Sequence, residues 1–133
     1  MRLLYVIFIF MMFFSCEDTF KQEQVIGKYV PIGYKNTFDT IWIKADSMYL
    51  RKVYDRNNRL VLSTTQKYIF LNNNIIDFYF FFENSDRDLI QFPELLKDTL
   101  GGEQCRLEKH KSYIRFCVGL ASQLHEYCYK KIK

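Results

Sequence analysis

The sequence is short of the residues from which catalytic and metal sites are built. It has only two histidines, His110 and His125, and neither has a partner at the spacing of zinc ligands. Its five glycines form no phosphate-binding loop, since Gly101-Gly102 is followed by Glu103 and by no Lys-Ser or Lys-Thr pair. No nucleophile elbow is present either. We therefore expect no catalytic residues, no metal and no cofactor, and we class the chain as a non-enzyme.

The charge of the chain shows no footprint of a nucleic-acid partner. There are 19 Lys and Arg residues against 15 Asp and Glu, a formal net charge of +4, and the two signs are well mixed. Nucleic-acid-binding domains instead gather basic residues on one face. A length of 133 residues suits one domain with a real core, and no internal repeat is visible.

One stretch resembles the opening of a calcium loop. Asn84, Asp86 and Asp88 alternate along the chain and carry oxygen atoms. Calcium needs about six to eight oxygen ligands and a sharp glycine turn at the sixth position of such a loop. Here the sixth position is Leu89 and the twelfth is Leu95. We interpret the stretch as a solvated turn without a metal.

One hydrophobic run is prominent, and it is too short to cross a membrane. The apolar residues 3–14 follow the basic Arg2 and end at Ser15. A transmembrane helix needs about 20 residues to cross about 30 Å of hydrocarbon. A basic start, an apolar stretch and a small residue at the end are the parts of an export signal. We interpret residues 1–15 as a signal peptide.

The end of this run resembles the lipobox of bacterial lipoproteins. In the sequence FFSC a small residue, Ser15, precedes Cys16, the position that is diacylated and becomes N-terminal in that class. The resemblance implies a lipid on Cys16 and the membrane as a partner. The polar residues 17–24 that follow predict a short tether, so we divide the rest of the chain into a lipidated tether over residues 16–24 and a β-rich domain over residues 25–133. Two other interpretations stay open, a conventional signal peptide beside an ordinary cysteine and an uncleaved N-terminal anchor.

The residues directly after Cys16 indicate where in the cell the protein is located. Glu17 and Asp18 resemble the acidic surface-export signals of some Gram-negative lipoproteins. The implied location is the cell envelope, with the outer membrane or the cell surface favoured over the inner membrane.

The rest of the chain is dominated by a period of two, which is typical of β-strands. The clearest strand covers residues 75–83, in which Ile76, Phe78, Phe80 and Phe82 share one face. A short helix is expected near residues 93–100, with Pro93 in its first turn and two glycines past its end. We expect an all-β fold of about eight antiparallel strands, in a small closed barrel or a sandwich. The expected strands cover residues 25–31, 39–44, 48–56, 59–70, 75–83, 104–109, 113–118 and 124–132.

Besides Cys16, the domain contains Cys105, Cys117 and Cys128, so at most one internal disulfide can form among the three. If residues 110–112 form the loop of a hairpin, Cys105 lies opposite Cys117. This geometry favours a disulfide between Cys105 and Cys117 over one between Cys117 and Cys128. The alternative is that all three are small buried hydrophobic residues.

The start of the domain resembles lipocalin-like small lipoproteins. In lipocalins the first strand carries a glycine, any residue and a tryptophan that plugs the base of the barrel, and Gly27-Lys28-Tyr29 occupies these places here. The resemblance implies the same fold and a small apolar ligand held in a cup, with no catalytic residues.

Two functions follow from these features. In the first, the barrel binds a small apolar ligand, and Phe78, Phe80 and Phe82 help to line its cavity. In the second, the domain binds an envelope protein as an inhibitor or immunity partner, through the irregular insertion at 84–102. A patch of Tyr113, Tyr127 and Tyr129 is a further candidate for such contacts.

Overall fold

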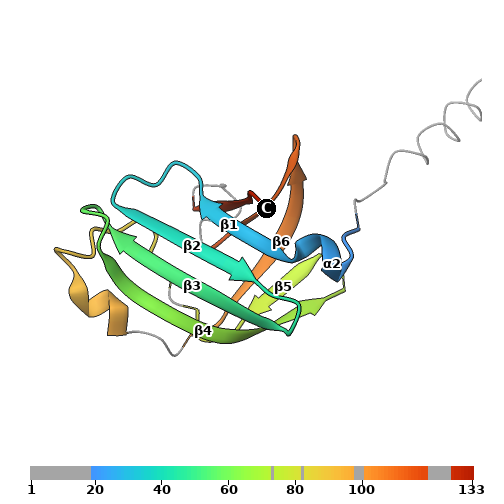
Figure 1. Cartoon of the computed structure of the whole chain (residues 1–133), viewed down its shortest axis with the longest axis horizontal. Coiled ribbons are helices and arrows are strands. Elements are labelled where there is room, and N and C mark those ends of the chain that lie inside the picture. Colours follow the sequence, from blue (N-terminus) through green and yellow to red (C-terminus); the bar gives the residue numbers. More distant parts are fainter. Residues whose placement is uncertain (1–18, 73, 82, 98–100, 120–126) are drawn as a thin grey trace, which may run out of the picture.

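The computed structural model describes residues 19–72, 74–81, 83–97, 101–119 and 127–133. Eight antiparallel strands close into a barrel in which each strand pairs with its sequence neighbours and the last pairs with the first (Figure 1). The expected all-β fold is therefore confirmed, in its barrel form rather than its sandwich form. The strands are β1 (Gly27–Pro31), β2 (Thr37–Ile43), β3 (Met48–Asp55), β4 (Leu60–Leu71), β5 (Ile75–Phe78), β6 (Glu103–His110), β7 (Tyr113–Cys117) and β8 (Cys128–Lys131).

Two short helical segments accompany the strands. The helix expected near residues 93–100 is a 3-10 turn, η1 (Pro93–Lys97), and residues 98–100 lie outside the described part of the chain. A second helix, α2 (Gln22–Val25), was not expected, since it overlaps the predicted tether. Phe20 packs against the core, so the fold begins earlier than residue 25. Within the described residues, no helix is long and apolar enough to span a membrane.

Aromatic rings fill the inside of the barrel. Every second residue of β2 and β3 is turned inward, and the inner faces of the other strands add Tyr29, Phe78, Phe116 and Tyr129 to Tyr49. Neighbouring rings in this group have centroids 4.9 to 5.4 Å apart. Tyr29, which stands where the lipocalin resemblance places tryptophan, is buried, and its hydroxyl donates to the Val25 carbonyl at 2.8 Å.

Strand β5 is shorter than the sequence pattern predicts. It ends at Phe78, and Phe80 has a left-handed backbone (φ 52°) and is 50% exposed. The expected inward position of Phe80 is therefore wrong, because the chain turns out of the sheet after Phe78. Phe81 is buried in its place, and Phe82 lies outside the described residues.

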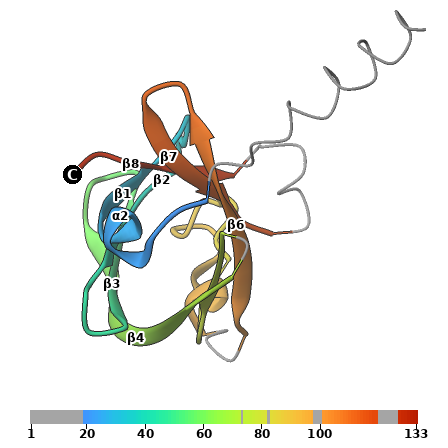
Figure 2. The same cartoon turned by 90° about the vertical axis from the view of Figure 1, so that its right-hand side faces the viewer.

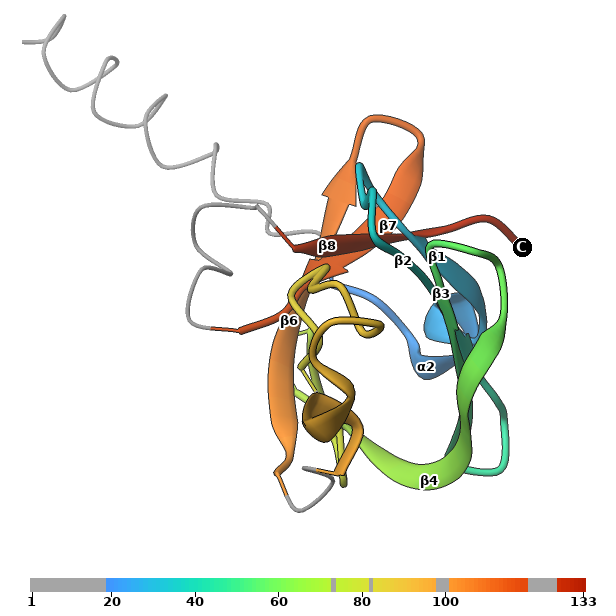
Figure 3. The ribbon, with the colours of Figure 1, turned by 90° about the vertical axis from the view of Figure 1, so that its left-hand side faces the viewer.

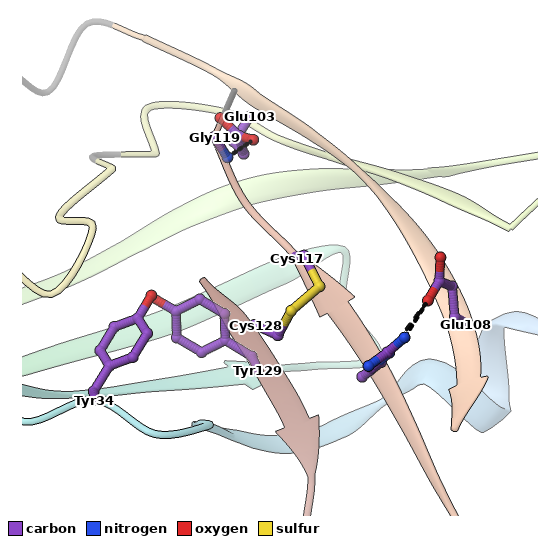
Figure 4. Close-up of a disulfide and its surroundings, with 8 residues drawn as sticks. Tyr34, Glu103, Glu108, Cys117, Gly119, Cys128 and Tyr129 are labelled. Carbon is purple, nitrogen blue, oxygen red and sulfur yellow. Dashed lines mark hydrogen bonds and ion pairs between the residues drawn. A yellow bond between two sulfur atoms is a disulfide. The ribbon is translucent and has the colours of Figure 1, made fainter. Parts of the chain in front are cut away.

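The disulfide joins Cys117 to Cys128, and Cys105 is a buried free thiol. The prediction of a Cys105–Cys117 bond is wrong, because it assumed that the loop of the β6–β7 hairpin is one residue longer than it is. His110 pairs with Tyr113, so the hairpin loop has two residues instead of three. This shift places Cys105 on the inner face and Cys117 on the outer face, directly opposite Cys128 on β8 (Figure 4).

The two ends of the barrel are covered differently. Helix α2 lies at one end (Figure 2), and residues 83–97 lie at the other (Figure 3). The C-terminal residues run beside the start of β1, where Lys28 donates its backbone N–H to Lys133 at 3.0 Å. Gly27 is required at this crossing, because a Cβ atom there would collide with the Lys133 carbonyl oxygen.

Candidate functional site

The connection between β5 and β6 contains an irregular stretch of 15 residues, which we call the 83–97 segment. It crosses the end of the barrel that lies away from α2 (Figure 1). Loops carried on a rigid scaffold are the usual place for binding residues.

The carboxylate of Asp86 fixes the segment to the β1–β2 connection. It accepts backbone N–H bonds from Lys35 at 2.8 Å, Asn36 at 2.9 Å and Thr37 at 2.9 Å. The backbone N–H of Asp86 donates in turn to Asn84 Oδ1 at 2.7 Å. A single side chain thus orders the start of β2 and the segment together.

The backbone at this point is strained. Ser85 and Asp86 both have left-handed φ angles, 43° and 52°. Such conformations cost about 1–3 kcal/mol each in residues other than glycine and persist where the surroundings hold them. The Asp86 hydrogen bonds supply that support, so the segment has a defined shape.

Apolar side chains give the segment an inner and an outer side. Leu89 is buried against Val53 at the end of the barrel, and Leu95 and Leu96 pack on the same small cluster. Ile90 and Phe92 instead face solvent, with 37% and 47% of their surface exposed. The segment is therefore anchored by one set of apolar residues and exposes another.

A buried ion pair lies beneath the segment. Arg51 Nε donates to Asp39 Oδ1 at 3.0 Å, and the cation of Arg51 lies 4.0 Å from the centre of the Phe81 ring. Asp39 Oδ2 also accepts from Asn84 Nδ2 at 2.9 Å and from the Tyr129 hydroxyl at 2.8 Å. Both charged residues are buried. The network links β2, β3, β8 and the 83–97 segment through one carboxylate.

Burial and the Asp39 carboxylate set the protonation of this network. Burial alone would lower the pKa of Arg51, but the adjacent Asp39 raises it above its ordinary value. Burial and Asp39 both raise the pKa of Tyr129. The guanidinium thus stays charged and the phenol stays neutral, so Tyr129 acts as a hydrogen-bond donor and not as a base. Its hydroxyl also accepts from Tyr34 at 3.3 Å (Figure 4).

The three residues that resemble the opening of a calcium loop make structural contacts instead. Asn84 and Asp86 bind side-chain and backbone groups as above, and Asp88 pairs with Arg56 at 3.1 Å. No group of three or more His, Cys, Asp or Glu residues that could hold a metal occurs in the described part of the chain. The sequence interpretation missed Asp39 and Arg51, although both stand in phase with the buried positions of their strands.

A groove lies at the α2 end of the barrel, where β3 begins and β5 ends. Its volume is about 820 Å³, which lies within the range of roughly 300–1,000 Å³ that is usual for small-molecule sites. Gln22 and Tyr68 line it, and Gln22 Nε2 donates to the Tyr68 hydroxyl at 3.5 Å. The apolar lining comes from Met48, Ile69, Phe70 and Phe80.

The exposed aromatic residues differ from those expected. Tyr129 is buried in the core, so the proposed patch of Tyr113, Tyr127 and Tyr129 does not form as a surface. Phe38 and Trp42 are exposed instead, on the outer face of β2.

Comparison of the chain with protein-family models, with curated proteins and with solved structures found no match.

Proposed function

We propose that this chain is a lipid-anchored protein of the cell envelope that binds another envelope protein through the 83–97 segment. The observation that carries the proposal is the two-sided character of this segment. Its inner side is held by Leu89, Asn84 and Asp86, while Ile90 and Phe92 are presented to solvent. An inhibitor or an immunity protein that blocks an enzyme or toxin would use such a surface.

The ordered shape of the segment supports binding. Association is weakened when a loop must first lose conformational freedom, and a loop ordered in advance avoids most of that loss. Large apolar side chains on a rigid support are typical of the residues that dominate binding energy. We therefore assign Phe92 and Ile90 as the central contact residues.

The lipid anchor rests on the leader and on Cys16. A disulfide between Cys117 and Cys128 supports an oxidising compartment outside the cytoplasm. We expect cells given radioactive palmitate to label the wild-type protein and to leave Cys16→Ala unlabelled. Label that persists in Cys16→Ala would place the lipid elsewhere, and an unlabelled wild-type protein would refute the anchor.

Replacing Phe92 with serine is expected to weaken partner binding while leaving the fold intact. Loss of a central contact residue lowers affinity by about 30-fold or more, whereas a surface substitution changes stability by about 0.5 kcal/mol or less. The measurement is the amount of partner that co-purifies with the tagged protein from membranes. Phe38→Ser is the matched control, because Phe38 and Phe92 are both 47% exposed.

If Phe92→Ser and Ile90→Ser retain as much partner as the wild type does, the 83–97 segment is not the contact surface. If wild-type protein retains no partner in stoichiometric amount, the interaction function itself is wrong.

The groove at the α2 end supports a second candidate function, the binding of a small apolar ligand. Since the barrel interior is filled by rings, we place such a ligand in the groove. We expect an apolar fluorescent dye to bind wild-type protein and to bind Ile69→Asp at least about tenfold more weakly, because a charge at this wall opposes apolar contact. Leu71→Asp is the control, on the same outer face of β4 but outside the groove. If Ile69→Asp and Leu71→Asp bind the dye equally well, the groove is not the site of ligand binding.

A further inference from the structure

A row of residues crosses the outside of the barrel at the α2 end. Trp42 on β2 pairs with Leu50 on β3 and with Lys28 on β1. Ile132 lies beside Lys28 and donates its backbone N–H to the Lys28 carbonyl at 2.8 Å. Trp42 is 52% exposed and Ile132 is 47% exposed. We call this surface, together with Lys52 and Lys130, the Trp42 face.

The charged side chains of the Trp42 face are all positive. Lys28, Lys52 and Lys130 lie at outward positions of β1, β3 and β8. Among the residues of β1, β2, β3, β4 and β8 the only carboxylates are Asp39 and Asp55, and both are buried. The outer face of these strands therefore carries lysines without interspersed acidic groups, and its potential favours a negatively charged partner.

The chain between Cys16 and the barrel is short. Phe20 already packs against the core, and four residue steps span at most about 14 Å. Helix α2 follows directly, and the Gln24 carbonyl accepts from Lys131 Nζ at 2.6 Å, so the helix lies beside the C-terminal strand. A lipid on Cys16 would hold this end of the barrel at a distance comparable with the Debye length of about 10 Å at 0.1 M salt.

We propose that the Trp42 face rests on the anionic surface of a lipid bilayer and orients the barrel on it. This inference rests on the lipid anchor of the proposed function. Indole rings favour the headgroup region of a bilayer, and lysines reach its phosphates while their alkyl stems stay in apolar contact. Each lysine near an anionic bilayer strengthens the contact about fivefold.

The orientation is compatible with partner binding. The 83–97 segment lies at the opposite end of the barrel from α2 (Figure 1). When the Trp42 face contacts lipid, Ile90 and Phe92 stay clear of that contact. The lipid surface and the protein partner would therefore use different parts of the molecule.

Trp42 is a natural reporter for this contact, because it is the single tryptophan of the chain. The acylated protein, purified from membranes, is reconstituted into vesicles of phosphatidylglycerol and phosphatidylcholine with brominated acyl chains. We expect the Trp42 emission to shift to shorter wavelength and to be quenched by the brominated lipid. High salt or vesicles of phosphatidylcholine alone should reduce both effects, since they weaken the attraction of the lysines.

Two variants of equal net charge test whether docking depends on where the lysines lie or only on the net charge of the protein. Lys28→Glu/Lys52→Glu reverses two charges on the Trp42 face, and Lys35→Glu/Arg87→Glu reverses two at the other end of the barrel. Loss of the two lysines alone lowers the ratio of docked to undocked protein by about 30-fold, so the first variant should lose the quenching. The second should keep it. Lys28→Gln/Lys52→Gln repeats the test without introducing acidic groups, and thermal melting confirms that each variant is folded.

The possible outcomes distinguish the anchor from the docking. If the acylated protein shows Trp42 open to aqueous acrylamide and unquenched by brominated lipid, the docking is refuted and the anchor stands. If mass spectrometry finds no acyl group, the anchor is refuted, and the same protein is added to anionic vesicles from solution. Salt-sensitive quenching of Trp42 then supports the docking, and its absence refutes the docking as well.

Discussion

Replacing Asp39 with leucine is expected to lower the free energy of unfolding by about 3–5 kcal/mol, since a buried cation is then left without its counter-ion. Arg51 loses the carboxylate that it contacts through Nε and through the terminal guanidinium nitrogen. Asn84 and Tyr129 lose their acceptor at the same time. A domain of this size is typically stable by about 5–15 kcal/mol, so the loss is a large share of the total. Chemical denaturation followed by circular dichroism measures it.

The double variant Asp39→Leu/Arg51→Met serves as the control. It removes both charges and replaces them with apolar side chains, an exchange that is often neutral or stabilising for a buried pair. We expect it to recover most of the lost stability. If Asp39→Leu alone changes the free energy of unfolding by less than about 1 kcal/mol, the ion pair does not hold the end of the barrel as described.

Replacing Cys117 and Cys128 with serine is expected to lower the free energy of unfolding by about 2–3 kcal/mol. The disulfide links residues 11 apart in the sequence, and a cross-link closing a loop of about 15 residues contributes about 3 kcal/mol through the unfolded state. Reductant should lower the melting temperature of the wild type and leave that of the double variant unchanged.

Cys105→Ala is the matched control for this experiment. Burial raises the pKa of the Cys105 thiol well above its ordinary value, so little reactive thiolate forms to exchange with the disulfide. Cys105→Ala should therefore respond to reductant as the wild type does. Peptide mapping without reduction that joins Cys105 to Cys117 would contradict the pairing.

Together the two predictions concern how the barrel is closed. The disulfide ties β7 to β8, while the Asp39 network ties β8 to β2 and to the 83–97 segment. Loss of the network should loosen the segment that carries Ile90 and Phe92. Asp39→Leu is thus expected to weaken partner binding as well as stability, whereas the cysteine variant should affect mainly stability.

Only part of the candidate site could be predicted from residue patterns in the sequence. Asn84, Asp86 and Asp88 were visible as a group of oxygen-bearing residues, but their partners lie far away, on the β1–β2 connection, on β2 and at the β3–β4 turn. Asp39 and Arg51 carried a detectable signal, a carboxylate and a guanidinium at buried positions of neighbouring strands. The two-sided use of Leu89 and Phe92 has no local signature, because it depends on which face meets the end of the barrel.

About eight strands in antiparallel order followed from local alternation, since a period of two directs every second side chain to the core. The place of Tyr29 inside the barrel was implied by the lipocalin resemblance. Closure of the barrel, the partner of Cys117 and the outward turn of Phe80 depended on contacts between distant residues. One residue less in the β6–β7 loop was enough to exchange the faces of a strand and with them the disulfide. Local chemistry thus determined which segments become strands, and long-range packing determined which surfaces and side chains meet.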